Sequence, residues 1–135
     1  MLYLKRNIIN QMIQWTLSER PNEAAGYLFK QNALFVKIIT ANHSAGHFYD
    51  ENPEALLKLI NKHGKVSGIF HSHPGRAIPS AMDYTYMKTT IPLFNCVWFI
   101  MSNDLKLRAW TLGSCVGGSF TGPIELEVEK MGGKS

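Results

Sequence analysis

Hydrophobic and polar positions recur along the chain with two different periods, and each change of period marks a new element. Between residues 9 and 17, apolar or methyl-bearing side chains fall at i, i+3, i+4, i+7 and i+8 among Asn, Gln and Ser residues. This spacing predicts an amphipathic helix that ends before Pro21. Short apolar runs predict β-strands instead. The predicted strands cover residues 2–5, 25–29, 33–40, 66–70, 95–102, 105–112 and 124–128.

Two further segments have the features of helices. Asn52 is a good N-cap residue with Pro53 at the first helical position after it, and Gly64 provides a stop at the other end. A third helix is predicted over residues 81–90 and is closed by Pro92. Because helices alternate with strands, we expect an α/β fold in which a mixed β-sheet is flanked by about three helices.

Length and composition agree with one small domain. The chain has 135 residues, of which 45% are hydrophobic and 18% charged, so we expect a single compact domain over residues 1–135. Residues 129–135 are expected to form a flexible tail. No run of about 18 apolar residues occurs, and polar residues interrupt the first apolar stretch, so neither a membrane span nor a signal peptide is predicted. These features indicate a cytoplasmic protein.

The charge balance and the cysteines exclude some classes of function. A net charge of +4 permits an acidic partner without identifying one. The chain lacks the Lys/Arg runs and basic-aromatic interleaving that are typical of nucleic-acid binders, so we expect no nucleic-acid partner. Cys96 and Cys115 are too few for a zinc knuckle, and a cytosolic chain keeps them reduced. A disulfide between adjacent late strands is the alternative.

Residues 71–83 carry the residue types of a metal site. His71 and His73 follow an apolar run, and positions i and i+2 of a strand face the same side. Asp83 would return to them from the start of the third helix. Two imidazoles and a carboxylate suit a catalytic zinc ion, which takes three protein ligands and leaves the fourth position to water. Two structural interpretations stay open, because Ser80 and Asp83 also form a capping-box pattern and strand histidines are often only core or surface groups.

The complete pattern is more specific than its parts. H-S-H-P at residues 71–74 and S-x-x-D at residues 80–83 resemble the signature of the JAMM (MPN+) metalloprotease family. Residues 21–29 are similar to the family's P-x-E-x-x-G segment, and the likeness extends over roughly residues 2–112. It implies an MPN-like (cytidine-deaminase-like) domain of a compact prokaryotic type. Three more segments also resemble sequences of the family: residues 48–54, 96–102 and 107–110.

The resemblance also implies a ligand set and a mechanism. It assigns one Zn²⁺ per chain to His71, His73 and Asp83, with water as the fourth ligand, and makes Glu23 the general acid/base acting on that water. Ser80 would stabilise the oxyanion, although N-capping is an equally good role. From the residues alone, Glu23 cannot be distinguished from other acids, because 47 residues separate it from His71. These other acids are Glu19, Asp50 and Glu51.

Three more histidines lie outside the motif. On their own they are more often surface or capping groups than ligands. They are His43, His47 and His63.

Two classes of function follow. The first is a zinc isopeptidase or peptidase, which by resemblance would cleave after the C-terminal Gly-Gly of a ubiquitin-like or sulfur-carrier protein. The alternative is a non-catalytic MPN scaffold, although such scaffolds typically lack the metal ligands that this chain has. Only residues 84–95 separate Asp83 from the next predicted strand, so the long insertion of ubiquitin-chain-specific members is missing. The sequence leaves open the oligomeric state and whether the substrate is a conjugate, a precursor or a charged sulfur carrier.

Overall fold

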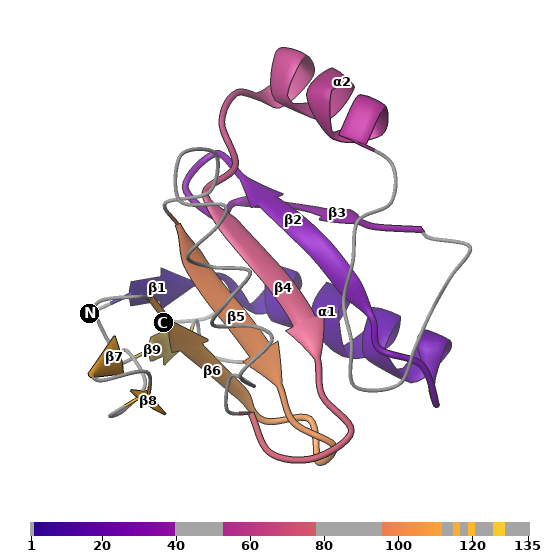
Figure 1. The fold of residues 1–135 in the computed structure, drawn as a ribbon, viewed down its shortest axis with the longest axis vertical. Helices are drawn as coiled ribbons and strands as arrows, with labels where there is room; N and C mark the ends of the chain where they lie inside the picture. Colours follow the sequence, from indigo (N-terminus) through magenta and orange to yellow (C-terminus); the bar gives the residue numbers. More distant parts are fainter. Residues whose placement is uncertain are drawn as a thin grey trace.

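Strands and helices alternate along the chain around one central sheet (Figure 1). The computed structural model describes residues 2–39, 53–77, 96–111, 115–116, 119–120 and 126–128. The helices are α1 (Arg6–Glu19) and α2 (Pro53–His63). The strands are β1 (Leu2–Leu4), β2 (Ala25–Phe29), β3 (Leu34–Lys37), β4 (Gly68–Ser72), β5 (Val97–Met101), β6 (Leu107–Trp110), β7 (Cys115–Val116), β8 (Ser119–Phe120) and β9 (Leu126–Val128).

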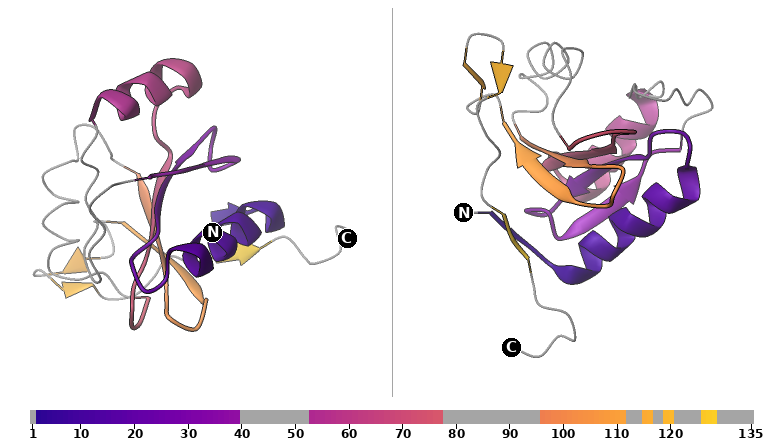
Figure 2. Two further views of the ribbon diagram at one scale, coloured as in Figure 1. Left: turned by 90° about the vertical axis from the view of Figure 1, so that its right-hand side faces the viewer. Right: turned by 90° about the horizontal axis from the view of Figure 1, so that it is seen from below.

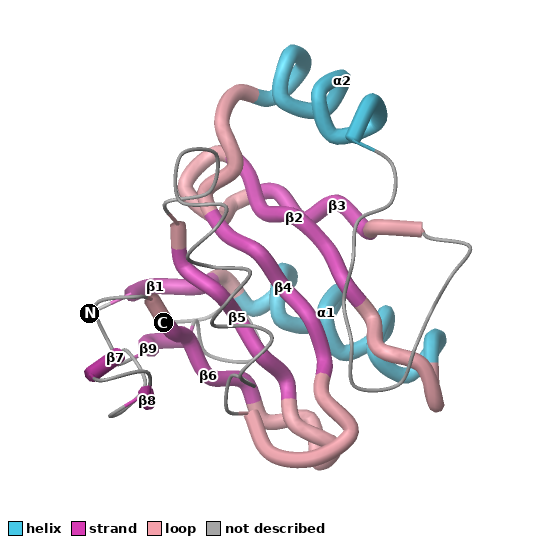
Figure 3. The backbone as a smooth tube through the Cα atoms, in the orientation of Figure 1, coloured by secondary structure: helices cyan, strands magenta, loops and turns pink. Residues whose placement is uncertain are grey.

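The central sheet has five strands in the order β3-β2-β4-β5-β6. β4 and β5 run parallel, whereas the other neighbouring pairs are antiparallel, so the sheet is mixed. Two small two-stranded sheets accompany it: β1 pairs with β9 in parallel, and β7 pairs with β8 in antiparallel fashion (Figure 3). The predicted α/β fold with a mixed sheet is therefore confirmed.

Each face of the sheet has its own hydrophobic core, because successive strand side chains point to opposite faces. On one face, Met12 of α1 belongs to the same buried cluster as Phe70 and Phe99. On the other face, Ile69 and Trp98 are clustered with side chains of α2. Figure 2 shows the two helices on opposite faces of the sheet. Since both faces are covered, every residue of β4 is buried.

Both helices end as the sequence predicts. Pro21 stands two residues beyond the end of α1, where its ring prevents the helix from continuing. After α2, Gly64 adopts a φ of 92° and its N–H donates to the carbonyl of Ile60 at 2.8 Å, which closes the last turn. In the part of the chain that the structure describes, neither helix has the length and apolar character needed to cross a bilayer.

The other predicted elements differ from the structure mainly at their boundaries. The strand predicted over residues 66–70 is observed as Gly68–Ser72, because Ser72 is still paired by a 2.9 Å hydrogen bond from its N–H to the carbonyl of Ala24. The short strands β7 and β8 were not predicted, since two residues are too few to produce a periodic pattern. The predicted helix over residues 81–90 and the tail at 129–135 lie outside the described residues.

Cys96 is a half-buried free thiol in the structure, so the alternative of a disulfide with Cys115 is not realised. Burial raises the pKa of Cys96 to about 12. The thiol is therefore protonated at neutral pH and is a poor nucleophile.

Candidate metal centre

Three of the predicted site residues share one face of the sheet because of the way β2 pairs with β4. In this antiparallel pair, Ala25 lies opposite His71. Two steps further along the same register, Glu23 comes opposite His73. Side chains two positions apart on a strand point to the same face, so the glutamate and both histidines converge. Pairing thus brings together residues that are distant in the sequence.

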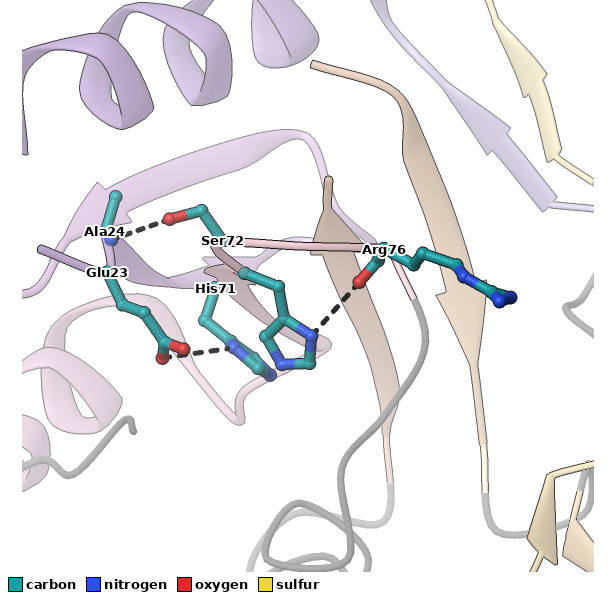
Figure 4. A network of polar contacts seen from close by, with 6 residues as sticks. Glu23, Ala24, His71, Ser72 and Arg76 are labelled. Atoms are coloured by element: carbon teal, nitrogen blue, oxygen red, sulfur yellow. Dashed lines mark hydrogen bonds and ion pairs between the residues drawn. The ribbon is translucent and has the colours of Figure 1, made fainter. Parts of the chain in front are cut away.

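Ser72 holds this register from the opposite face of β4. Its N–H donates to the carbonyl of Ala24 at 2.9 Å, and its Oγ accepts the N–H of Ala24 at 2.9 Å (Figure 4). The sequence analysis gave Ser72 no role. Its place between two histidines on a strand was the available signal, because alternation turns it away from them.

The polar ends of the three side chains approach one another closely. One ligand-type atom from each of Glu23, His71 and His73 lies within 4.8 Å of the other two. Nδ1 of His71 is 3.6 Å from Oε1 of Glu23, and Figure 4 shows these two groups facing each other. Among the described residues, this is the only group of at least three His, Cys, Asp or Glu side chains with such spacing.

Burial differs within the group. His71 is fully buried and Glu23 is 6% exposed, whereas His73 is half-buried. A buried carboxylate is stable only when it is paired, hydrogen-bonded or bound to a metal. The cluster therefore places a carboxylate and an imidazole in the protein interior, and solvent reaches the cluster at His73.

Packing and hydrogen bonding fix the two imidazole rings. Trp98 stands edge-on to His71, with ring centroids 5.7 Å apart and an interplanar angle of 88°. Nδ1 of His73 lies 3.2 Å from the carbonyl oxygen of Arg76. A carbonyl can only accept, so Nδ1 carries the proton in the neutral ring, which leaves the lone pair that could bind a metal on Nε2. This arrangement is typical of metal-binding histidines.

The loop that follows His73 is also anchored. The N–H of His73 donates to the carbonyl of Met101 at 2.8 Å, which continues the pairing of β4 with β5. The indole N–H of Trp110 donates to the carbonyl of Ala77 at 2.9 Å. The sequence analysis did not assign this supporting role to Trp110, although a buried indole N–H usually requires an acceptor.

The structure separates the predicted site residues into those that meet and those it does not describe. Glu23, His71 and His73 meet, whereas Ser80 and Asp83 lie outside the described residues, so the complete ligand set stays a prediction. Of the competing acids, Glu19 belongs to α1 and not to this group. His63 is not part of the group either and packs against Phe29, with ring centroids 5.4 Å apart. Four other candidates lie outside the described residues: His43, His47, Asp50 and Glu51.

The donor set fits a zinc ion. Imidazole nitrogens and carboxylate oxygens are both regular zinc ligands, and here two imidazoles and one carboxylate converge. The hydrogen bond from His73 to Arg76 fixes the tautomer that binding requires. The half-buried position of His73 provides a route for the ion.

A pocket of about 230 Å³ adjoins the cluster. Glu23 and His73 form part of its wall. The end of α1 contributes Arg20, and the turn between β5 and β6 contributes Asn103. Thr16 and Ser72 line it too, and both carboxylate oxygens of Glu23 are buried, so the pocket lies toward α1 and meets Glu23 through its other atoms.

Comparison with a family model connects this site to known proteins. The model of the prokaryotic homologues of the JAB domain matches residues 5–113. No curated protein matches the chain.

Several solved structures have the same fold. A protein from Desulfitobacterium hafniense is similar with a TM-score of 0.70 and 20% identity, over 96% of this chain and 94% of that one. A JAB1/MPN domain protein from Archaeoglobus fulgidus gives a TM-score of 0.60 and 18% identity, over 95% and 99%. A structure described as JAMM, a metalloprotease-like zinc site in the proteasome and signalosome, gives 0.55 and 17%, over 96% and 99%. At these identities the likeness concerns the fold alone.

Proposed function

Because the chain belongs to the family of prokaryotic homologues of the JAB domain, we propose that it is a zinc-dependent isopeptidase or peptidase. Its substrate is the bond after the C-terminal Gly-Gly of a ubiquitin-like or sulfur-carrier protein. The observation that carries this proposal is the convergence of Glu23, His71 and His73, whose ligand-type atoms lie within 4.8 Å of one another. The similar fold of a protein described as a metalloprotease-like zinc site supports the choice of metal.

In this proposal, the zinc ion is held by His71, His73 and Asp83. Nε2 of His73 would bind the ion, since its Nδ1 is committed to the carbonyl of Arg76. Contact with Trp98 keeps the ring of His71 in place. When bound, zinc supplies Lewis-acid chemistry and lowers the pKa of the attacking water to about 7.

Glu23 moves the proton. Its carboxylate takes a proton from the water as the water oxygen bonds to the carbonyl carbon, and it delivers that proton to the leaving nitrogen as the C–N bond breaks. The products are the Gly-Gly carboxylate and a free amine. Glu23 is buried and its Oε1 lies 3.6 Å from Nδ1 of His71, so the carboxylate stands next to a proposed zinc ligand. Ser80 is the proposed donor to the oxyanion.

A glycine tail suits a site that is recessed at the end of a sheet. His71 is fully buried and only His73 is half-buried, so a substrate backbone must approach closely. Glycine has no Cβ and permits such an approach. The partner is therefore a protein with an extended Gly-Gly tail, and the proposal includes neither nucleic acid nor membrane.

Mass spectrometry of cleavage products tests the proposal. Zinc-loaded protein is incubated with a panel of Gly-Gly-tailed proteins that carry extensions, with and without a chelator. We expect cleavage directly after Gly-Gly, which the chelator abolishes. Replacing the last glycine with valine should remove most of the activity, because the side chain would clash beside the metal.

Two results would contradict the proposal in different ways. Equal cleavage of peptides without Gly-Gly would indicate a general peptidase. Binding of Gly-Gly-tailed proteins without any cleavage would indicate a non-catalytic scaffold.

A further inference from the structure

We propose that Arg76 and Arg108 bind carboxylates in the part of the substrate that directly precedes its Gly-Gly tail. These two side chains are called the basic rim. The inference rests on the proposed function and narrows its substrate to a carrier protein with acidic residues before the two glycines.

The register of the sheet places Arg108 on the same face as the candidate metal centre. His71 of β4 is the Cα partner of Ile100 in β5, and Ile100 is the partner of Arg108 in β6. Partnered residues of neighbouring strands point to the same face. Arg108 therefore lies in the same cross-strand row as His71, on an edge strand of the central sheet. Its side chain is exposed.

The loop after β4 carries Arg76 across to β6. The carbonyl of Gly75 accepts the N–H of Asn103 at 2.8 Å. On the other side of Arg76, the carbonyl of Ala77 accepts the indole N–H of Trp110 at 2.9 Å. Asn103 precedes β6 and Trp110 ends it, so Arg76 is held beside the strand that contains the other arginine. Figure 4 shows its side chain extending away from the candidate metal centre.

Nearby carboxylates do not balance the charge of the basic rim in the part of the chain that the structure describes. Lys106, two positions before Arg108, forms an ion pair with Asp104 at 3.9 Å. Within the described ranges, neither arginine of the rim forms an ion pair. A guanidinium group has five N–H donors in a planar fork that matches a carboxylate. Two exposed guanidinium groups beside the site therefore favour an acidic partner.

The basic rim lies within reach of the substrate tail. Two strand spacings separate His71 from Arg108, which corresponds to roughly 10 Å. An extended chain advances about 3.3 Å per residue, so Arg108 would meet a residue about three positions from the cleaved bond. On the carrier side, that position falls just before Gly-Gly. We assign the carboxylates to this side because the carrier is common to all substrates of the proposed reaction.

Arg108 also has an alternative role that involves no substrate. A charged side chain on an edge strand deters pairing with the sheet edge of another molecule. That role would make no difference between an acidic and a neutral peptide. Recognition of carboxylates requires such a difference.

The experiment measures binding of two synthetic peptides to the full chain supplied with zinc, by isothermal titration calorimetry. Both peptides end in Gly-Gly as the free acid. Glu residues precede the glycines in one, and Gln residues replace them in the other. Both correspond to reaction products, so cleavage does not interfere. We expect Kd to be about 3- to 30-fold lower for the acidic peptide at low ionic strength, as for two exposed ion pairs. Added salt should reduce this preference.

Replacement of the two arginines identifies the contact. Arg108→Gln and Arg76→Gln should each reduce the preference for the acidic peptide, and the double variant should remove it. Lys62→Gln is the matched control, because it removes one positive charge from an exposed side chain of α2. Figure 1 shows α2 at the other end of β4 from the β5–β6 turn. This variant should keep the preference of the unmodified protein.

Several results would overturn the acidic-tail site. Equal binding of the two peptides, or no measurable binding of either, excludes recognition of carboxylates before Gly-Gly. An equal loss of preference in Arg108→Gln and Lys62→Gln would mean that net charge acts at a distance. Tighter binding of a short oligothymidylate than of the acidic peptide, lost in Arg108→Gln, would assign the basic rim to nucleic acid instead.

Binding and cleavage together separate this inference from the proposed function. If Gly-Gly-tailed proteins are cleaved and the peptides show no preference, the acidic-tail site is wrong and the proposed function stands. If the preference depends on the two arginines but no Gly-Gly-tailed protein is cleaved, the proposed function fails. The acidic-tail site would then belong to a protein that binds such tails without cutting them.

Discussion

Two buried polar clusters flank the β2–β4 pair, one at each end. At the turn end, the N–H of Asn32 donates to Oγ of Ser67 at 2.9 Å, and that hydroxyl donates to Oδ1 of Asn32 at 2.9 Å. At the opposite end, Glu23 faces His71 across 3.6 Å, which is longer than a direct hydrogen bond. The first cluster closes on itself, whereas the second brings titratable groups together around a common point.

The difference shows that burial alone does not identify a functional site. Asn32 is 8% exposed and Glu23 is 6% exposed, so their burial is nearly the same. An amide and a hydroxyl satisfy each other and do not titrate near neutral pH, so they support a turn. A carboxylate and two imidazoles are metal ligands and proton carriers. The comparison predicts that changes at one end affect chemistry and changes at the other affect stability.

The largest effect is expected from His73→Ala. Zinc content should fall from about one ion per chain to nearly none, and turnover should be lost, because a catalytic zinc site needs three protein ligands. The fold should persist, since His73 lies beyond the end of β4 and is half-buried. Elemental analysis of protein purified without added metal, with circular dichroism alongside, measures both.

His63→Ala provides the histidine control, because His63 packs against Phe29 outside the cluster. This variant should keep its zinc. The site assignment is wrong if His73→Ala retains zinc, or if the folded, unmodified protein contains none and binds none when it is offered.

Glu23→Gln should have the next largest effect. The change preserves the shape of the side chain but removes the base, so kcat should fall on the order of 10²–10⁴-fold while zinc is retained. Steady-state kinetics together with metal analysis test this. Glu19→Gln is the matched control, since Glu19 ends α1 and is not part of the cluster.

Two results would contradict this role for Glu23. Unchanged turnover in Glu23→Gln would move the base to another acid: to Glu19 if Glu19→Gln loses turnover instead, and otherwise to Glu51, which would be tested next. Loss of zinc together with activity would make Glu23 a ligand instead.

The sequence predicted the local parts of both clusters better than their assembly. The spacing of His71 and His73 on one strand was sufficient to place them on one face, because alternation is a local property. Whether Glu23 lies near these histidines depends on the register of β2 against β4, and the hydrophobic periodicity of the sequence does not specify that register. Resemblance to a family selected Glu23, and only the structure placed it beside His71.

The turn end shows the same limit. Residues 30–32 lie between the strands predicted over 25–29 and 33–40, and they adopt left-handed φ values of 55°, 56° and 66°. The hydrogen bonds that accompany this conformation come from Ser67, which lies more than thirty positions further along the chain. A pattern of hydrophobic and polar residues contains no signal for such a long-range contact. The boundary of β4 was displaced for the same reason, since its pairing with Ala24 determines where it ends.

The smallest effect is expected at the turn end, where Gly68→Ala should lower stability and leave the chemistry intact. A Cβ on Gly68 would lie 2.8 Å from Oδ1 of Asn32 and 2.9 Å from Cε2 of Phe99. Relieving such overlap in a packed interior should cost about 1–3 kcal/mol of unfolding free energy. Denaturant unfolding measures the loss, and kcat per folded molecule should remain near that of the unmodified protein.

Gly75→Ala is the control at the catalytic end, because a Cβ there would meet nothing within 4 Å. Its unfolding free energy should change by no more than about 0.5 kcal/mol, as for a surface substitution. Equal destabilisation by both changes would show that steric overlap with Asn32 is not the cause. If Gly68→Ala instead reduced zinc content or kcat at unchanged stability, the two ends of the β2–β4 pair would be coupled. The contrast between a structural cluster and a chemical one would then fail, because a strain introduced beside Ser67 would be transmitted along the pair to His71.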